Sequence, residues 1–441
     1  MSAPPATLSR RHVAAAVIGN ALEFYDFVTY AFFAVQIGHA FFPTHNAYAS
    51  LMLSLGTFGA GFAMRPLGGI VLGRYADKVG RKPAMLLSFA LMGCAILAVA
   101  VIPSYAMIGI TAPVLVVLAR MVQGFALGGE VGSSTAFLME AAPLYERGFY
   151  AAWQGGSQYI ASFVGGIVGV VLTTAMDPTS FDTYGWRIAF ALGALTLPFG
   201  LLVRKSLPET LHLSEDAHTA VQTGRTATLL RSNARAIGLG LIVLASATIF
   251  TYVTNYMTTF AETVLHMSAR VSLSATLMLG ICGVIGMQYG GWLSDRIGRW
   301  PVMVIPRLIY IVVVYPVYLW MVDTRSVTAL LVGTAFLQLL GTISFAPFYA
   351  ALTESLPKQI RGVVFGTIYA ISIATFGGTT QLVITWLMHI TQSPLAPAVY
   401  SLASGVIGTI AMAMMRETAP AKLEQLRAAA RGGAAAAASA D

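Results

Sequence analysis

Six charged residues lie inside long apolar runs of this chain: Glu23, Asp26, Arg65, Arg120, Glu130 and Arg307. A charge at the depth of a lipid bilayer is costly unless it is paired or hydrated, so such a residue usually marks a functional site. A carboxyl group there can take up and release a proton, and the planar fork of an arginine can hold a carboxylate. These residue types indicate proton exchange and anion binding inside a membrane.

Glu23 and Asp26 are the first candidates for proton exchange. If their helix begins near Val13, a rise of about 1.5 Å per residue places them ~15 Å and ~20 Å into a hydrocarbon core ~30 Å thick. Residues three apart share a helix face, and two nearby acids in a low dielectric make one of them easier to protonate. Glu130 is a further candidate for the coupling proton. The alternative is that Glu23 and Asp26 are structural charges with permanent partners.

The arginines are candidates for binding a carboxylate. Arg120 is followed one turn later by Gln123 on the same face. Arg65 precedes Pro66 and a pair of glycines, which allow bending and close packing, and its alternative role is as a permanent partner of a helix-one acid. Arg307 lies only about five residues into its apolar run, so we expect its side chain to snorkel to the interface.

In three further apolar runs, uncharged polar residues are spaced so that they share one helix face. Such faces indicate a hydrated path for the substrate or, alternatively, hydrogen bonds between helices. The faces comprise Gln154, Ser157, Gln158 and Ser162; Thr248, Tyr252, Asn255, Tyr256 and Thr259; and Ser372, Thr375 and Thr379. The complete set predicted to bind substrate is Asn20, Arg65, Arg120, Gln123, Gln154, Gln158, Tyr252, Asn255 and Tyr256.

The elements that must position these residues are membrane helices. Of the 441 residues, 57% are hydrophobic and 10% are charged, too few charges to cover a soluble surface. The apolar runs are continuous rather than alternating, which predicts helices and an all-α membrane protein. Twelve spans follow: 13–37, 50–73, 84–104, 111–139, 148–175, 187–204, 236–263, 271–293, 302–322, 327–352, 363–389 and 395–415.

The basic residues predict how these spans are oriented. With twelve spans, 20 of the 26 Lys and Arg fall on the side of the two termini, three in the opposite loops and three inside helices. Cytoplasmic loops carry such an excess, so both termini are expected in the cytoplasm. The same asymmetry accounts for the net charge of +8 without a nucleic-acid partner, and it places basic residues against anionic lipid.

An internal repeat predicts two related six-helix halves in the same orientation. Gly73-xxx-Asp77-Lys78-x-Gly80-Arg81 recurs as Gly291-xxx-Asp295-Arg296-x-Gly298-Arg299, and Glu140-xx-Pro143-xxx-Arg147 recurs as Glu354-xx-Pro357-xxx-Arg361. Glu209-Thr210 recurs as Glu417-Thr418. The acids and bases of these turns could form breakable gate contacts, with Glu140 and Glu354 pairing with Arg81 and Arg299. The alternative is a simple positive-inside turn.

The repeat divides the chain into five parts. We expect a cytoplasmic tail at 1–12, a six-helix half at 13–205, a cytoplasmic loop at 206–235, a second half at 236–415, and a cytoplasmic, partly disordered tail at 416–441. The last segment begins with a short basic helical pattern, Ala421–Ala430.

The repeated motifs resemble those of the major facilitator superfamily, from about residue 13 to 418. Within it, Gly19-Asn20-xx-Glu23-x-Tyr25-Asp26-Phe27 and Arg65-Pro66-Leu67-Gly68-Gly69 look like the metabolite:proton symporter family. Leu352-Thr353-Glu354 and Phe376-Gly377-Gly378 are among stretches similar to bacterial citrate–proton symporters and tricarballylate transporters. The resemblance implies secondary active import of a small organic acid with protons across a bacterial inner membrane. The second gate motif departs from the family by ending in Arg299-Trp300, where a further basic residue is usual.

Several functions are disfavoured by what the sequence does not contain. There is no Walker motif, so we expect no ATP as energy source, and no HExxH, so we expect no zinc hydrolase. No catalytic constellation or metal site is visible, and an enzyme is not expected. The coupling ion is expected to be the proton, with sodium left open because Asn20 and Glu23 could also hold it. Import of 2-oxoglutarate, shikimate, proline or betaine, or an efflux antiport, remains as an alternative.

Overall fold

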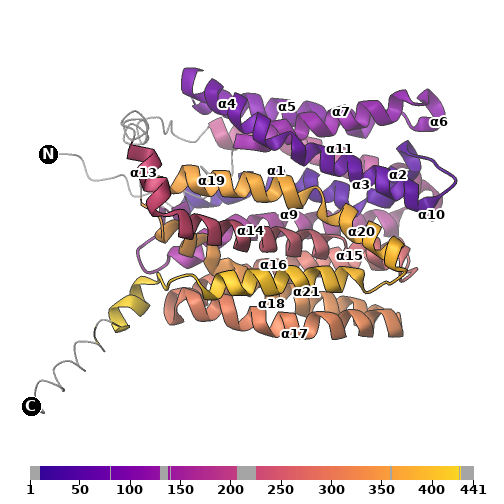
Figure 1. The fold of residues 1–441 in the computed structure, drawn as a ribbon. Helices are drawn as coiled ribbons and strands as arrows, with labels where there is room; N and C mark the ends of the chain where they lie inside the picture. Colours follow the sequence, from indigo (N-terminus) through magenta and orange to yellow (C-terminus); the bar gives the residue numbers. More distant parts are fainter. Residues whose placement is uncertain are drawn as a thin grey trace, which may run out of the picture.

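The computed structural model describes residues 10–79, 81–129, 138–139, 141–205, 225–357, 360–426 and 428. The described part of the chain is built from helices that run side by side (Figure 1). Grouped by continuity they form the twelve-helix arrangement predicted from the apolar runs, in two halves of six. All-α membrane architecture is therefore confirmed.

The first half occupies the upper part of Figure 1 and is coloured indigo to magenta. Its elements are α1 Arg10–Phe32, α2 Ala34–Phe41, α3 Ala47–Ala63, α4 Arg65–Val79, α5 Arg81–Val101, α6 Tyr105–Ile108, α7 Thr111–Ala126, η1 Leu127–Gly129, α9 Arg147–Ala175, α10 Pro178–Ser180, η2 Phe181–Gly185 and α11 Trp186–Lys205. A further helix, α13 Arg225–Ser232, lies in the segment that was predicted to be a loop.

The second half is coloured from crimson through orange to yellow in Figure 1. It comprises α14 Ala234–Asn255, α15 Met257–Thr263, α16 Ala269–Ile297, α17 Arg299–Thr324, α18 Val327–Glu354, α19 Arg361–Ser372, η4 Ile373–Gly377, α20 Thr380–Thr391 and α21 Ala396–Ala413. Beyond α21, residues 420–426 are helical, within the segment where the sequence predicted a short helix.

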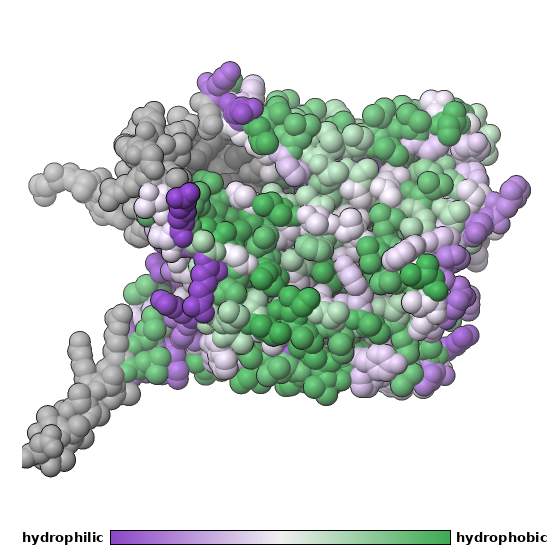
Figure 2. Space-filling model, viewed as in Figure 1, coloured by the Kyte–Doolittle hydropathy of each residue, from purple (hydrophilic) through white to green (hydrophobic). Residues whose placement is uncertain are grey.

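We call the end of the bundle at which α1 begins and α21 ends the proximal end, and the opposite end the distal end. Polar side chains gather at these two ends, and a broad apolar band lies between them (Figure 2). Eight of the described helices are long and apolar enough to cross a membrane, by length and composition. Exposed leucine, isoleucine and valine side chains on the band suit a lipid environment.

Several spans in the described part of the chain contain a break, such as the one at Phe33 between α1 and α2. Residue Met64 interrupts the rod of α3 and α4 directly before Arg65-Pro66, where the proline ring removes a backbone donor. Tyr256 separates α14 from α15, and the five-residue π-helical segment η4 separates α19 from α20. Broken helices at membrane depth are tolerated where the freed backbone groups are buried in protein.

The two halves meet along α9 with α16 and α18, and along α3 with η4 and α20. Glycines permit these approaches, since an added Cβ at Gly166 would lie 2.8 Å from the backbone nitrogen of Leu277. A Cβ at Gly59 would similarly lie 2.8 Å from the carbonyl oxygen of Gly378. Small residues at the interface therefore bring the two halves into close contact around the molecule's centre.

Candidate functional site

Asp26 and Arg120 form a buried ion pair between α1 and α7. Their side chains are 1% and 0% exposed, and Arg120 Nη1 lies 3.4 Å from Asp26 Oδ2. The same nitrogen donates a hydrogen bond to the Oε1 atom of Gln123, one turn further along α7. Three residues singled out from the sequence thus meet at one point. Of the two predicted acids in α1, Asp26 is the one that pairs with Arg120.

Arg65 occupies a neighbouring position at the first residue of α4. It is 4% exposed, and its guanidinium carbon lies 4.4 Å from the centre of the Phe62 ring. Glu23, Tyr252 and Tyr369 are all close enough to act on it electrostatically. Glu23 from the first half and two tyrosines from the second half therefore surround this arginine.

Phe27 lies between the two arginines. The guanidinium carbons of Arg65 and Arg120 are 4.5 Å and 4.6 Å from the centre of its ring. A cation is attracted to the face of an aromatic ring, most strongly where water is excluded. The ring and the two acids together offset the repulsion between two like charges placed this close.

Glycines hold α3 and α7 at the separation that this arrangement needs. An added Cβ at Gly124 would overlap the carbonyl oxygen of Gly61, and one at Gly61 would lie 2.9 Å from the carbonyl oxygen of Arg120. No side chain larger than hydrogen fits between these backbones without movement. The glycine contact therefore sets the depth and the lateral position of Arg120.

Both arginines retain unused hydrogen-bond donors. Within the described residues, the Nε and Nη2 atoms of Arg65 and of Arg120 are buried and have no hydrogen-bond partner, and the same holds for Asp26 Oδ1. Buried charged donors without partners are costly, and sites that bind a ligand commonly contain them. Two adjacent forks with free donors can hold two carboxylate groups of one small molecule.

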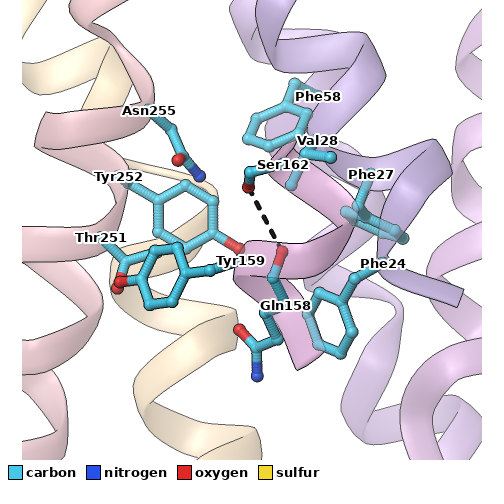
Figure 3. Close-up of a pocket in the computed structure, with 10 residues that line it drawn as sticks. All are labelled: Phe24, Phe27, Val28, Phe58, Gln158, Tyr159, Ser162, Thr251, Tyr252 and Asn255. Atoms are coloured by element: carbon cyan, nitrogen blue, oxygen red, sulfur yellow. Dashed lines mark hydrogen bonds between the residues drawn. The ribbon is translucent and has the colours of Figure 1, made fainter. Parts of the chain in front are cut away.

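A small cavity lies beside these arginines, between the two halves (Figure 3). Phe24, Phe27 and Val28 enter it from α1 and Phe58 from α3. Gln158, Tyr159 and Ser162 come from α9, and Thr251, Tyr252 and Asn255 from α14. The predicted residues Gln158, Tyr252 and Asn255 thus line the cavity. Phe27 and Phe58, which contact the arginines, form the wall between them and the cavity.

Tyr369 is a residue that the sequence reasoning missed. It belongs to α19, and its hydroxyl group lies 3.4 Å from Gln158 Nε2 of α9, so it joins the two halves. It also acts on Arg65. The aromatic residues Tyr159 and Phe58 were missed as well, because a ring in an apolar run looks the same whether it faces lipid or a cavity.

Three further predicted substrate residues do not line the cavity. Asn20 donates a 2.6 Å hydrogen bond to Ser157 Oγ, which links α1 to α9. Tyr256 accepts a 2.9 Å hydrogen bond from Thr385 Oγ1 in α20. Gln154 is buried, with neither side-chain amide atom bonded within the described residues. Asn20 and Tyr256 fit the alternative interpretation of hydrogen bonds between helices.

The face predicted for the eleventh span is wrong in its second half. Ser372 is buried as expected, whereas Thr375 and Thr379 are exposed. The buried positions are Thr380 and Gln381 instead. The π-helical segment η4 adds about one residue to a turn, so the residue aligned with Ser372 is eight positions on rather than seven.

The expectation for Arg307 is also wrong, because its side chain does not reach the interface. It is 0% exposed, donates a 3.0 Å hydrogen bond to Ser246 Oγ, and lies over the rings of Tyr310 and Phe345. α17 begins earlier than the predicted span and places Arg307 deeper in the bundle. Aromatic faces, rather than interfacial water, surround this cation.

At the proximal end the two halves are joined through Asp295 of α16. Its carboxylate oxygens accept hydrogen bonds from the backbone nitrogens of Gly148 and Phe149, at 2.8 and 2.9 Å, at the start of α9. Arg299 lies 2.6 Å from Asp295 Oδ1 and 3.2 Å from Glu354 Oε1. The predicted pairing of Glu354 with Arg299 is thus present, and a carboxylate occupies a helix N-terminus where it is favoured.

The remaining predicted gate residues divide into two groups. Arg147 begins α9 and Arg361 begins α19, as the repeat implies. Glu130 and Glu140 lie outside the described residues, and so do the side chains of Asp77 and Arg81. The proton role of Glu130 and the first copy of the gate therefore stay predictions.

At the distal end other contacts join the halves. Gln36 Nε2 of α2 donates a 2.9 Å hydrogen bond to Glu262 Oε1 of α15, and the Tyr48 ring stacks on His389 with a centroid separation of 4.0 Å. Within the first half, His39 Nδ1 of α2 lies 3.4 Å from Asp182 Oδ2 of η2. Contacts between the two halves are therefore present at both ends of the described structure.

No group of three or more His, Cys, Asp or Glu side chains is placed to hold a metal ion in the part of the chain that the structure describes. Among the described residues, the charged groups gathered around Phe27 are Glu23, Asp26, Arg65 and Arg120. Their arrangement can exchange protons and bind anions.

The sequence pattern of the Major Facilitator Superfamily matches residues 16–378. The chain belongs to this superfamily. Among curated relatives, the citrate-proton symporter of Salmonella typhi is 36% identical over 398 residues, covering 90% of this chain and 92% of the relative. The citrate-proton symporter of Klebsiella pneumoniae is 34% identical over 410 residues, covering 93% and 92%. The alpha-ketoglutarate permease of Escherichia coli is 33% identical over 372 residues, covering 83% and 84%.

Solved structures agree on the fold. A D-xylose-proton symporter superposes with a TM-score of 0.76, at 17% identity, over 93% of this chain and 98% of the other. Superfamily membership and these relatives establish a multi-pass membrane transporter and not an enzyme.

Proposed function

We propose that this superfamily member imports citrate or a closely related tricarboxylate together with protons. The observation that carries the proposal is the pair of buried arginines around Phe27, each with hydrogen-bond donors left free within the described residues. Two such forks suit a small molecule with more than one carboxylate group. Two relatives more than 30% identical over most of this chain are named citrate-proton symporters, which supports the same substrate class.

In the empty carrier, Asp26 holds Arg120. As long as the acid is charged, the arginine is engaged with an internal carboxylate at 3.4 Å. When a proton neutralises Asp26, that attraction is lost and Arg120 becomes available to a carboxylate of the substrate. Glu23 acts electrostatically on Arg65, and its protonation would likewise weaken its attraction for that arginine.

Proton binding and substrate binding then favour each other. By thermodynamic linkage, if protonation strengthens substrate binding, substrate must favour protonation to the same degree. Low pH should therefore tighten substrate binding. The cavity-lining residues Gln158, Tyr252 and Asn255, with Tyr369 beside them, supply hydrogen-bonding groups for the remaining polar atoms of the substrate.

The transporter is proposed to reside in a bacterial inner membrane, with its proximal end in the cytoplasm. Most Lys and Arg outside the helices lie on the side of the termini, and this excess marks the cytoplasmic face. The hydrogen bonds of Asp295 with Gly148 and Phe149 would then close the cytoplasmic side, with Arg299 holding Asp295, and the Gln36–Glu262 contact would close the outside. In alternating access, the contacts at one end break while the contacts at the other end remain formed.

The test is uptake by proteoliposomes that contain the purified protein. Labelled citrate is supplied under an inward proton gradient, with unlabelled tricarballylate, 2-oxoglutarate, shikimate, proline or betaine as competitors. Strong competition by tricarballylate, with weak competition by proline and betaine, is the expected result. Exclusive competition by 2-oxoglutarate or by the zwitterions would overturn the substrate class. A parallel series with a sodium gradient separates the two coupling ions.

A further inference from the structure

The hydrogen bond between Gln36 and Glu262 is a polar link between the two halves at the distal end. Gln36 comes from α2 in the first half and is 3% exposed, and Glu262 comes from α15 in the second half. The distance between Gln36 Nε2 and Glu262 Oε1 is 2.9 Å. Opening the distal end must separate these two side chains.

Only half of the Gln36 amide is used in this contact. Its Oε1 atom is buried and accepts no hydrogen bond within the described residues. A charged Glu262 carboxylate cannot satisfy it, because a carboxylate has only acceptor atoms. An unsatisfied buried acceptor is destabilising. The closed arrangement of the distal end is therefore less stable as long as Glu262 is charged.

We propose that Gln36 and Glu262 form a latch that a proton from the outside solution tightens. One proton adds to the Glu262 carboxylate, and no other covalent bond changes. The new O–H group can donate to Gln36 Oε1 while Gln36 Nε2 continues to donate to Glu262. The pair then has two reciprocal hydrogen bonds instead of one, and the buried acceptor is satisfied.

Two charged groups act on Glu262 from the surrounding elements: His39 of α2 and Asp182 of η2. Asp182 favours protonation of Glu262 and a protonated His39 opposes it. Through its hydrogen bond, the Asp182 carboxylate raises the pKa of His39, so this histidine stays positive to a higher pH than an isolated one. The largest influence on Glu262 is its burial, which favours the neutral carboxyl group, whereas the hydrogen bond that Gln36 donates favours the charged carboxylate. Protonation would give the pair a second hydrogen bond through Gln36 Oε1.

The consequence is a bias toward distal closure at low external pH. The inference rests on the alternating access of the proposed function, in which the distal end faces outward. A proton that arrives from outside would favour closing the distal end behind the substrate. This step is separate from Asp26 and Glu23, which lie in the centre of the bundle.

The experiment measures the distance across the distal end by electron spin resonance of pairs of spin labels. Labels are attached to cysteines at Ala47 and Val327, two exposed positions at the distal ends of α3 and α18, one in each half. The background carries Cys94→Ser and Cys282→Ala. The protein is reconstituted in lipid without substrate or gradient, and spectra are recorded between about pH 5 and pH 8.

We expect the unmodified latch to show more of the short, closed distance as pH falls. Glu262→Gln keeps an acceptor and adds an amide donor for Gln36 Oε1, so it should give the closed distance at every pH. Gln36→Leu removes both the amide donor and the amide acceptor that face Glu262. It should give more of the long distance and a weaker pH dependence. Asp323→Asn, which removes an exposed carboxylate at the same end, is the matched control and should behave as the unmodified protein does.

Two results would overturn the latch. One is a pH dependence in Glu262→Gln equal to that of the unmodified protein, and the other is a distal end that opens as pH falls. Because no citrate is present, failure of the latch is distinguishable from failure of the proposed substrate. If citrate is not taken up but the distance between the spin labels still responds to pH as expected, only the proposed substrate is rejected. The latch proposal then remains supported.

Discussion

At the residue scale, Asp26 is the group whose protonation the proposed mechanism needs. Asp26→Asn removes the charge that holds Arg120 and keeps nearly the same shape, so it should mimic the protonated acid. We expect this variant to bind and exchange substrate and to lose accumulation driven by a proton gradient. Counterflow and gradient-driven uptake, measured on the same proteoliposomes, separate the two activities.

Glu23→Gln is the comparison for Asp26→Asn. If both variants keep full proton-driven accumulation, the proton site lies elsewhere and the mechanism is wrong. Loss in Asp26→Asn alone would assign coupling to the Asp26–Arg120 pair, and loss in Glu23→Gln alone would assign it to the acid that acts on Arg65.

Arg120 should be sensitive even to a change that keeps its charge. Arg120→Lys retains a cation but loses the planar fork, whose Nε and Nη2 atoms carry the free donors. We expect substrate binding to weaken by roughly 1–3 kcal/mol, the range for a hydrogen bond to a charged group, which corresponds to about 5- to 150-fold in Kd. Binding is measured by calorimetry at low pH. An unchanged Kd would contradict direct contact with Arg120.

The charged members of the site could be found in the sequence, and most of the others could not. Asp26 and Arg120 stand out because a charge in an apolar run has few explanations other than function. Phe27 and Tyr369 do not stand out, because their roles depend on which way the helix faces and on contacts between distant segments. A polar face on one helix likewise cannot show whether its partner is a substrate or another helix, as Asn20 illustrates.

At the scale of elements, the close approach of α3 and α7 is what places Arg120. Gly124→Ala adds a Cβ that would overlap the Gly61 carbonyl, so the helices must move apart. Overpacking of this kind costs about 1–3 kcal/mol, and we expect a lower melting temperature with weaker substrate binding. Thermal unfolding in detergent measures the first effect.

Gly56→Ala in α3 is the matched control, because nothing lies within 4 Å of its added Cβ. Alanine is up to about 1 kcal/mol better than glycine inside a helix, so this variant should be as stable as the original or slightly more so. Equal destabilisation by the two substitutions would show that the contact between α3 and α7 is not the cause.

The proximal contact of α16 with α9 should control turnover rather than binding. Asp295→Asn removes the charge next to Arg299 and one of the two acceptors that hold Gly148 and Phe149. We expect the proximal end to open more readily and the transport rate to fall several-fold, with substrate binding still measurable. The exposed Asp323→Asn serves again as control. A transport rate equal to that of the original protein would argue against a gate.

Helix existence was predictable from the sequence, and helix register was predictable only where the helix is regular. The apolar runs define the spans because a membrane segment must be long and continuous. The π-helical segment at Ile373–Gly377 has no composition of its own, so the shift from Thr379 to Thr380 could not be foreseen. The burial of Arg307 depends on three aromatic rings from separate helices, which one sequence segment cannot show.

At the scale of the whole molecule, the orientation of the bundle follows from its basic residues. Cysteines introduced at Val327, at the distal end, should react with a membrane-impermeant reagent added to intact cells. A cysteine at the exposed Trp300, at the proximal end, should react only after the membrane is opened. The reverse pattern would invert the proposed topology and with it the direction assigned to each gate.

The repeat in the sequence revealed two related halves, because three motif pairs recur in the same order. It could not reveal which conformation the halves adopt. Contacts between the halves, such as Tyr48 with His389, join segments from different halves and belong to no repeated motif. Such contacts have to be seen in three dimensions.

The four central charges also have an electrical consequence. At their ordinary charges, Glu23 and Asp26 cancel Arg65 and Arg120, so these four groups together carry no net charge when the halves rock. A membrane potential acts on a moving charge with about 2.3 kcal/mol per 100 mV. It would do no net work on these four groups during that step, because their charges sum to zero. These four groups should therefore add no voltage dependence to the return of the unloaded carrier. At this site a current should arise from the loaded step, in proportion to the protons bound in excess of the substrate's own negative charges.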